Sequence, residues 1–368
     1  MPASPINSPS RSVVYFGLYD PREYPGVHQK VIGVLRAAAA AGFQTRVWTE
    51  PFRKTAPLGR LSKAIDEAPE THMILRSLGF ANLFILPALW RARRRGCHVT
   101  LEVGAPNYIA VKEIWTSRQS LWRRTRAVAA FYVSGPWSLW PANRIVQYAP
   151  ESWWFRLGNA SKTVEIGNGI DVAAIEPRAS APAWPAPVLR LIAVATVSKW
   201  HGYDRLLRAI TAFAARADRT FDVHLTIVGQ GPALDGLRAL SSTLGLDGRV
   251  VFAGTVTGAP LRDLYAQSHL AVSSLGLHRI GLSTASVLKA REYCAIGIPF
   301  IASGNDPDFS AWLNFRFPVS ASEDTRDIVD AFEEFAKTAG RIDPAAMRQY
   351  AFEHLDWKHK LDAFGVNT

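Results

Sequence analysis

Residues 189 to 217 read LRLIAVATVSKWHGYDRLLRAITAFAARA. The first seven residues form a short, mostly apolar run, which favours a buried strand. After a polar connection, residues 203–217 place apolar side chains three and four positions apart, which is typical of an amphipathic helix. The stretch therefore predicts a strand followed by a helix, which is the repeating unit of a parallel sheet.

The same alternation continues on both sides of this stretch. Further strands are expected at 221–229, 249–254, 269–274 and 298–303, and in the first half at 12–19, 43–49, 72–76, 98–103, 144–148 and 163–167. In the first half, VHQKVIGVLRAAAAAG (27–42) predicts a helix closed by Gly42. We therefore expect an α/β protein in which a parallel sheet covered by helices occurs twice.

The two halves are separated by a proline-rich segment, RASAPAWPAP (178–187). It contains three prolines and has no periodicity, so it resists both a helix and a central strand. We interpret it as an interdomain linker. A surface loop within one large domain is the alternative, which the repeated pattern on both sides disfavours.

The composition fits a folded protein with anionic partners. The length of 368 residues suits two domains, and 48% hydrophobic with 20% charged residues is a globular composition. Lysine and arginine outnumber aspartate and glutamate by 42 to 31, a net charge of +11, which favours phosphates, nucleic acid or an acidic membrane surface.

Only Cys97 and Cys294 are present, so a reducing, cytosolic setting is expected. We find neither a signal-peptide pattern nor the ~18 uninterrupted apolar residues of a membrane helix.

Candidate binding residues follow the strands, because ligands bind at the carboxyl ends of parallel strands. Gly26 opens a helix whose free amides suit an acceptor, although a simple turn is an equal alternative. Glu102 is a candidate for acid/base catalysis and Asn107 for acceptor binding, with helix capping as the alternative for the carboxylate. Gly229 and Gly231 let the backbone approach a donor, although Gly-x-Gly is often only a tight turn.

Six motifs, one at the end of the first half and five in the second, occur in an order that resembles the family-4 retaining glycosyltransferases. They are NGID (168–171), KWHGYDRLLRA (199–209), IVGQGP (227–232), VVFAGTV (250–256), LYAQSHLAVSS (264–274) and LKAREYCAIGIPFIAS (288–303). The variant signature KWHGYDR, with LGLHR and LKxREY, is similar to a branch that takes part in bacterial capsular, exopolysaccharide or O-antigen synthesis. Each motif alone is unremarkable, and their order is the specific signal.

The resemblance implies the GT-B fold, in which two Rossmann-like doubly wound domains face a cleft. It divides the chain into an acceptor-binding domain (1–175), a linker (176–188), a nucleotide-sugar-binding domain (189–345) and a C-terminal helix that packs towards the first domain (346–368). EHLDWKHKLDAFG (353–365) is the expected crossing helix. The implied activity is that of a nucleotide-sugar-dependent hexosyltransferase with a glycan or polyprenyl-linked saccharide as acceptor.

The sequence departs from the family at the donor site. The family has two glutamates eight positions apart, of which the second contacts the donor ribose. Glu292 matches the second, and Thr284 stands in place of the first. The family's Arg and Lys that neutralise the donor diphosphate fall on Thr196 and His201.

Other cations border the expected donor site and compensate for this lost charge. Lys199, Arg279 and Lys289 lie in three loops or helix starts, and a leaving diphosphate needs cations or amides around it. We predict catalytic roles for Arg279 and Lys289, and donor-binding roles for Lys199, His201, His278 and Glu292. A solvated loop is the alternative for His278 and Arg279, and a surface helix face for Lys289.

No cofactor and no metal ion are expected. The nine histidines lack a paired His-x-x-x-His or Asp-x-Asp pattern, so we predict a metal-independent transferase whose only nucleotide is its donor substrate. DPDF (306–309) follows a strand and is a candidate for touching the donor, although a turn is the favoured reading.

Two basic segments of the first domain combine arginine with tryptophan: WRARRRG (90–96) and LWRRTRAVAAF (121–131). Both are expected to be helical, and such helices lie on anionic bilayers. This predicts a cytoplasmic protein that is peripheral on the inner face of the membrane. Solvated helix faces with a few buried tryptophans are an equal alternative.

Three other functions remain open at the level of sequence. The first is an inactive GT-B scaffold in a polysaccharide assembly complex, which the missing first glutamate favours slightly. The second is a GT-B sugar-nucleotide epimerase, since a fold does not fix a function. The third is nucleic-acid binding, which only the charge suggests and no motif supports, so we expect no nucleic acid partner.

Overall fold

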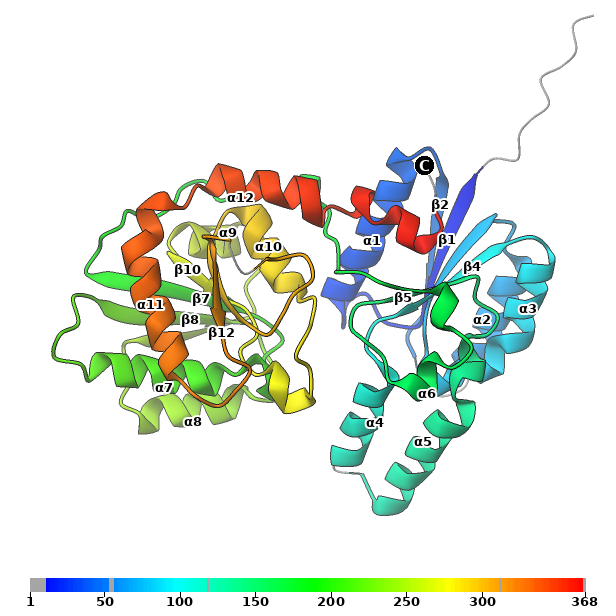
Figure 1. Ribbon diagram of the computed structural model, residues 1–368, viewed down its shortest axis with the longest axis horizontal. Coiled ribbons are helices and arrows are strands. Elements are labelled where there is room, and N and C mark those ends of the chain that lie inside the picture. Colours follow the sequence, from blue (N-terminus) through cyan, green and yellow to red (C-terminus); the bar gives the residue numbers. More distant parts are fainter. Residues whose placement is uncertain (1–10, 53–55, 118, 311–312, 367–368) are drawn as a thin grey trace, which may run out of the picture. The chain divides into compact units, whose positions relative to one another are not determined.

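The computed structural model describes residues 11–52, 56–117, 119–310 and 313–366. The chain divides into two compact units (Figure 1). Unit 1 contains the residues up to Asp171 together with those from Asp356 on, and unit 2 spans Val172–Leu355. None of the helices in the described part of the chain has the length and apolar character needed to cross a membrane.

Unit 1 is a six-stranded parallel sheet in the order β2-β1-β3-β4-β5-β6. Its strands are β1 (Ser12–Gly17), β2 (Gln44–Thr49), β3 (His72–Arg76), β4 (His98–Val103), β5 (Arg144–Gln147) and β6 (Thr163–Glu165). Its main helices are α1 (Pro25–Ala40), α2 (Ala56–Glu67), α3 (Leu86–Arg94), α4 (Asn107–Thr116), α5 (Leu121–Ser134) and the short α6 (Trp153–Arg156). The predicted strands and the first helix are confirmed to within a few residues at their ends.

The sheet of unit 1 is covered on both faces, as a parallel sheet requires. Successive side chains of a strand point to opposite faces, so Val14 and Phe16 of β1 pack in one apolar cluster and Val13 and Tyr15 in another. Helices α2 and α3 supply the first cluster, and α1 supplies the second. The second cluster also contains side chains from the end of the chain.

The C-terminal segment completes unit 1, but not as the single helix expected over 353–365. Helix α12 (Pro344–Tyr350) is followed by the π-helical turn η8 (Ala351–Leu355) and by the short 3₁₀ helices η9 (Trp357–His359) and η10 (Leu361–Phe364). The helix breaks because Asp356 pairs with Ile170 as a β-bridge and caps the next turn by accepting a hydrogen bond from the Lys358 amide.

Trp357 fixes this segment to unit 1. Its side chain is 1% exposed, and its amide donates to the carbonyl of Ile170 at 3.1 Å. A Cβ at Gly33 or Gly169 would come within 2.7 or 2.5 Å of the indole, so both positions need glycine. The NGID motif therefore has a packing role at its Gly169.

Unit 2 is a second six-stranded parallel sheet, in the order β12-β11-β10-β7-β8-β9. Its strands are β7 (Val188–Val194), β8 (Asp222–Val228), β9 (Val250–Gly254), β10 (Leu270–Val272), β11 (Phe300–Ser303) and β12 (Arg316–Val319). Besides α12, its helices are α7 (Tyr203–Ala214), α8 (Leu234–Thr243), α9 (Ala259–Ala266), α10 (Leu288–Ile296) and α11 (Arg326–Thr338). Strand β12 is the strand that the sequence pattern did not predict.

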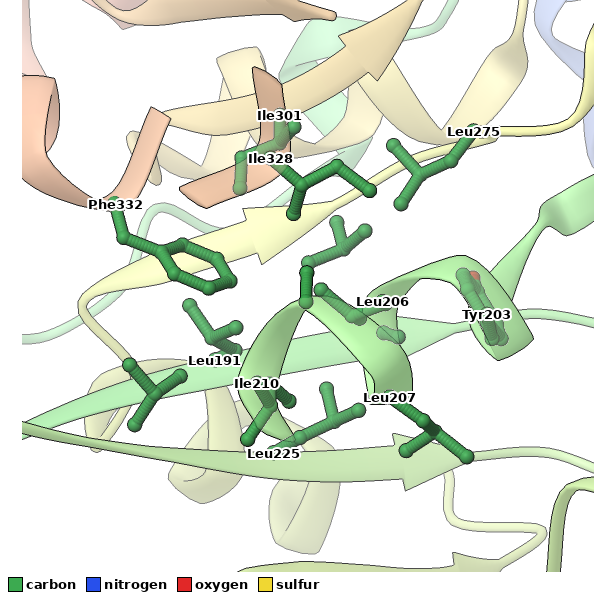
Figure 2. Packing of buried hydrophobic residues seen from close by; sticks show 14 of the residues in the cluster. Leu191, Tyr203, Leu206, Leu207, Ile210, Leu225, Leu275, Ile301, Ile328 and Phe332 are labelled. Atoms are coloured by element: carbon green, nitrogen blue, oxygen red, sulfur yellow. The ribbon is translucent and has the colours of Figure 1, made fainter. Parts of the chain in front are cut away.

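The opening stretch forms the centre of unit 2. Leu206, Leu207 and Ile210 of α7 are fully buried against strands β7 and β8, and Phe332 of α11 packs in the same cluster (Figure 2). The spacing of these apolar residues thus produces the buried face of α7. The α/β class with two doubly wound parallel sheets is confirmed.

The proline-rich segment 178–187 forms neither helix nor strand. It lies against unit 2, because Trp184 packs on the core and its Nε1 donates to the carbonyl of Ala336 at 3.0 Å. The division between the units falls before it, at Asp171 and Val172.

Candidate functional site

Four neighbouring strands of unit 2 end at the same sheet edge. They lie in the order β11-β10-β7-β8, and the loops that follow them cover residues 304–309, 273–287, 195–202 and 229–233. The chain order reverses between β7 and β10, and in open α/β sheets ligands bind at such a reversal. Most of the expected donor-site residues lie in these loops or in the first turns of the helices after them.

The two glycines after β8 hold the loop against the loop after β7. A Cβ at Gly229 would lie 1.9 Å from the carbonyl oxygen of Ala195, and one at Gly231 would lie 2.3 Å from that of Val197. Gly229 also has φ +124°, which side chains rarely adopt. The amide of Val197 donates to the carbonyl of Gln230 at 2.8 Å. The glycines therefore fix the shape of this edge even without a ligand.

His201 is a buried, neutral imidazole at this edge. It ends the 3₁₀ turn η5 (Lys199–His201), and its Nδ1 accepts a hydrogen bond from the amide of Ser198 at 3.0 Å. Burial, with a further contribution from the Lys289 ammonium, lowers its pKa to about 4, although the Ser198 backbone opposes this. Nδ1 also lies 3.3 Å from the Ser198 carbonyl, but the contact with the amide is the shorter of the two. A neutral ring that accepts this amide carries its proton on Nε2, which is then a donor. His201 therefore does not replace the missing cation, although the Lys289 charge reaches it.

Lys289 and Glu292 form an ion pair on α10. The Lys289 Nζ lies 2.9 Å from Glu292 Oε2, as their spacing of three residues on a helix predicts. The hydroxyl of Tyr265 from α9 donates to Glu292 Oε1 at 3.5 Å. Both side chains of the pair remain about one third exposed. Tyr265 is the member of this group that sequence reasoning missed.

Arg279 has all five guanidinium N–H groups engaged. They donate to both carboxylate oxygens of Asp204 at 2.7 and 2.8 Å, to both of Glu323 at 2.7 and 2.6 Å, and to the carbonyl of Lys199 at 2.9 Å. These hydrogen bonds, led by those to Glu323, raise the pKa of Arg279. The guanidinium therefore joins three segments of unit 2, and a diphosphate would have to displace one of its carboxylates.

We call Arg279 with its partners Asp204, Glu323 and the Lys199 carbonyl the Arg279 clamp. His278 and Lys199 lie beside it. His278 Nε2 is 2.8 Å from Glu323 Oε1, so this histidine belongs to the Arg279 and Glu323 cluster. The side chain of Lys199 is exposed, while its carbonyl accepts from Arg279. Of these two residues, Lys199 is the one whose charged group is presented to solvent.

The DPDF segment has a structural use. Arg291 of α10 is 0% exposed and donates to both oxygens of Asp306 at 2.7 Å and to Asp308 at 2.5 Å. A fully buried guanidinium needs such partners. The two aspartates thus anchor the helix that presents Lys289 and Glu292, and this agrees with the turn that the sequence favoured.

In unit 1, Glu102 lies in a sealed ion cluster. Its carboxylate is 0% exposed and contacts the Lys30 ammonium at 2.5 Å, the Tyr148 hydroxyl at 2.5 Å and the Tyr15 hydroxyl, with Arg76 at 3.7 Å. Burial raises the pKa of Glu102, but the Lys30 and Arg76 charges outweigh it and lower the pKa to about 2. General acid/base catalysis needs a pKa near the working pH and access to the substrate. Glu102 has neither a pKa near neutral pH nor access to a substrate, as its expected catalytic role would require.

The two expected acceptor residues lie at helix starts in unit 1. Gly26 is exposed in the first turn of α1, and a Cβ there would meet no atom within 4 Å. Asn107 begins α4, where its own amide and that of Tyr108 donate to the carboxylate of Glu151. The amides at the start of α4 are thus occupied, whereas Gly26 borders open space. Over the described residues, no group of three or more histidine, cysteine, aspartate or glutamate side chains is arranged to hold a metal ion.

Most of unit 2 matches a known protein family. Residues 189–335 match the family model described as glycosyl transferases group 1. This match supports a glycosyltransferase. No curated protein matches the chain.

Solved structures with the same fold cover almost the whole chain. Sucrose-phosphate synthase from Thermosynechococcus elongatus has a TM-score of 0.67, with 15% identity over 96% of this chain and 97% of its own. A glycosyltransferase from Rickettsia africae has a TM-score of 0.64, with 12% identity over 96% and 98%. HepE from Anabaena, solved in complex with UDP-glucose, has a TM-score of 0.64, with 12% identity over 95% and 98%. These likenesses confirm the GT-B fold class.

Proposed function

We propose that this protein is a retaining, metal-independent glycosyltransferase of family 4, which moves a hexose from a nucleotide diphosphate sugar to a glycan or lipid-linked saccharide. We place it in bacterial surface polysaccharide synthesis, on the cytoplasmic face of the membrane. The observation that supports this most directly is the Lys289 and Glu292 pair beside His201, at the strand edge of a domain that matches glycosyl transferases group 1.

In this proposal the donor ribose binds Glu292, whose two oxygens accept from Lys289 and Tyr265 and are therefore held in a fixed orientation. Lys289 faces the diphosphate, which carries about two negative charges as it leaves. His201 contributes a neutral hydrogen-bond donor from Nε2, and the exposed Lys199 adds a second cation. The charge that Thr196 and His201 do not supply thus comes from two lysines.

Arg279 has a different role in this scheme from the catalytic one expected from sequence. Its five donors hold the Lys199 carbonyl, Asp204 and Glu323. We therefore propose that it positions the loop of Lys199, without touching the donor.

The same residues define the chemical class of the donor but not its base. One carboxylate for a ribose and cations for a diphosphate suit any nucleoside diphosphate sugar. HepE, which shares the fold, was solved with UDP, with UDP-glucose and with UDP and glucose. Uridine nucleotides are therefore the first donors to test.

The experiment is a thermal-shift screen of nucleoside diphosphates and their sugars, followed by turnover assays with the stabilising donor. We expect stabilisation by at least one diphosphate sugar, slow hydrolysis that persists in a chelator, and a product with the anomeric configuration of the donor by NMR. Absence of both binding and turnover across the panel contradicts the proposal.

An inactive scaffold is the second candidate, and two observations favour it: Thr284 replaces the first family glutamate, and Glu102 is sealed in its cluster. Stabilisation by a donor with no turnover on any acceptor or water supports it. Conversion of the donor to its epimer without release of nucleotide identifies the epimerase alternative.

A further inference from the structure

Helices α4 and α5 form a hairpin at one side of unit 1. Figure 1 shows them side by side, extending away from the sheet. The Arg124 Nη1 of α5 donates to the carbonyl of Trp115 of α4 at 2.7 Å, and its guanidinium lies 5.7 Å from the centre of that indole. Arg124 thus fixes the end of α4 to the start of α5. We call the exposed residues Trp115, Leu121 and Trp122 the hairpin tip.

The hairpin tip exposes large apolar side chains. Trp122 is 68% exposed, Leu121 60% and Trp115 49%. Beyond the tip, the exposed stripe of α5 continues through Arg126, Ala129 and Val133, four, seven and eleven positions after Trp122. A helix end that leaves two indoles and a leucine in water is typical of an interaction surface.

The chain carries charge of a single sign from the end of α4 onward, just after Lys112 and Glu113. From Ile114 to Pro150 the sequence contains no aspartate or glutamate, and its basic residues are Arg118, Arg123, Arg124, Arg126 and Arg144. In the part of the chain that the structure describes, no ion pair engages Arg123, Arg124 or Arg126. Instead the guanidinium of Arg126 lies 5.6 Å from the centre of the Trp122 ring. The surface therefore favours an anionic partner with an apolar layer beneath it.

The other basic helix of unit 1 differs in this respect. Arg91 of α3 donates to both oxygens of Asp66 at 2.9 and 2.6 Å, and Arg95 is 3.8 Å from the same carboxylate. Asp66 therefore offsets part of the charge of that helix. In the described structure none of Arg123, Arg124 and Arg126 has a carboxylate partner, whereas two arginines of the 90–96 segment share Asp66.

We propose that the hairpin tip docks on an anionic lipid bilayer. The indoles of Trp115 and Trp122 and the side chain of Leu121 lie at the level of the headgroups, and Arg123 and Arg126 bind lipid phosphates. This deepens the proposed function, on which it rests, by naming the surface that brings unit 1 to a lipid-linked acceptor.

The test is co-sedimentation of the full-length protein with vesicles of phosphatidylcholine alone or mixed with phosphatidylglycerol. We expect binding to the mixed vesicles that weakens as salt is raised. The charge variant Arg123→Gln/Arg126→Gln lowers the partition coefficient about tenfold or more, since one basic residue near an anionic surface is worth about fivefold. The tip variant Leu121→Ser/Trp122→Ser also lowers it, because it removes the apolar area that enters the headgroup layer. Absence of binding by the wild-type protein overturns the proposal.

The matched control is Trp90→Ser/Arg93→Gln on α3, where Arg93 lies 5.4 Å from the centre of the partly exposed Trp90 ring. This variant removes one indole and one guanidinium from another helix, and we expect it to bind vesicles like the wild type. An equal loss in the control shows that only the total charge matters and overturns the proposal. A change of oligomeric state in the tip variant, with vesicle binding retained, identifies a second copy as the partner and also overturns it.

A vesicle-free measurement separates this proposal from the proposed function. The thermal shift with a nucleoside diphosphate depends on unit 2 and stays unchanged in the tip and charge variants. Vesicle binding without any nucleotide response removes the transferase proposal and leaves the docking surface. A nucleotide response without vesicle binding does the reverse.

Discussion

Burial changes the proton affinity of the His201 imidazole. Folded His201 has a pKa of about 4, whereas an unfolded histidine titrates near ~6.5. Between these values unfolding takes up a proton, so the free energy of unfolding rises with pH, by up to about 1.4 kcal/mol per pH unit from this group. The stabilisation is present above the unfolded value and is lost as the pH falls towards 4.

We therefore predict that His201→Asn has a weaker pH dependence of stability than the wild type. The asparagine Oδ1 replaces Nδ1 as the acceptor for the Ser198 amide, so the turn is kept while the titrating ring is removed. The measurement is the difference in urea unfolding between the two proteins at several values between pH 4 and 7. Parallel curves across this range contradict the prediction.

Glu292 is predicted to account for much of the affinity for the donor. A hydrogen bond to a charged group is worth about 1.5–3 kcal/mol, so Glu292→Ala weakens binding of a stabilising nucleotide by about 10-fold to 100-fold. Isothermal titration measures this. Glu334→Ala on α11 removes an exposed carboxylate of the same unit and serves as the control. Equal affinities of the Glu292 variant and the wild type remove the ribose role.

Lys289 is predicted to act on the leaving diphosphate. Removal of one group that stabilises developing charge costs about 10²-fold to 10³-fold in kcat, which we expect for Lys289→Met. Lys289→Arg keeps the charge and restores part of the rate. Steady-state kinetics with the identified donor give the values, and a change in KM alone assigns Lys289 to binding only.

At the scale of elements, the loop after β8 depends on Gly229. A side chain there would approach the Ala195 carbonyl to 1.9 Å and adopt φ +124°, so Gly229→Ala is expected to lower stability by more than about 1 kcal/mol. Gly236 lies within α8, where an added Cβ meets no atom within 4 Å, and Gly236→Ala is neutral or stabilising. Thermal unfolding compares the two, and similar melting temperatures contradict the close packing of the loops.

The Arg279 clamp is likewise predicted to act through its partners. Arg279→Lys keeps the charge but loses the fork of donors, so it is expected to lower the melting temperature and raise KM for the donor. The variants Asp204→Asn and Glu323→Gln weaken the same clamp and reproduce part of both effects. If they leave KM unchanged while Arg279→Lys abolishes turnover, the guanidinium contacts the donor itself.

The elements of this fold were largely predictable from sequence because their apolar runs are short, buried and bounded by polar loops. β12 was missed since Pro318 interrupts a strand of four residues. The helix at the end of the chain was expected as one piece from the resemblance to the family, whereas its contacts with Ile170 break it into turns. Periodicity reports the local preference and not the long-range partner that overrides it.

Site residues were predictable where the partner is close in sequence. Lys289 and Glu292 are three residues apart, and their ion pair follows from helix geometry. Arg279 pairs with Asp204 and Glu323, which come from distant segments of the chain. Nothing in the sequence indicates that the N–H groups of its guanidinium already have acceptors within the protein. The sealing of Glu102 is of the same kind, because its partners come from four other elements.

At the scale of the whole molecule, unit 1 is made from both ends of the chain. Trp357→Ala removes the indole that fills the space left by Gly33 and Gly169, and such a change costs about 3–5 kcal/mol. We expect a lower melting temperature, with the nucleotide response of unit 2 retained. Unchanged thermal unfolding means that the end of the chain contributes nothing to the stability of unit 1.

The return of the chain at Asp356 also sets an order of events during synthesis. Unit 2 is continuous from Val172 to Leu355, so all its residues have been made before the last covering piece of unit 1 exists. One face of the first sheet is covered only by α1 on the nascent chain until Trp357, Leu361 and Phe364 have left the ribosome. The amino-terminal unit is thus the last to complete its fold, the reverse of the usual order. A stop codon before Trp357 would leave unit 1 without this covering segment.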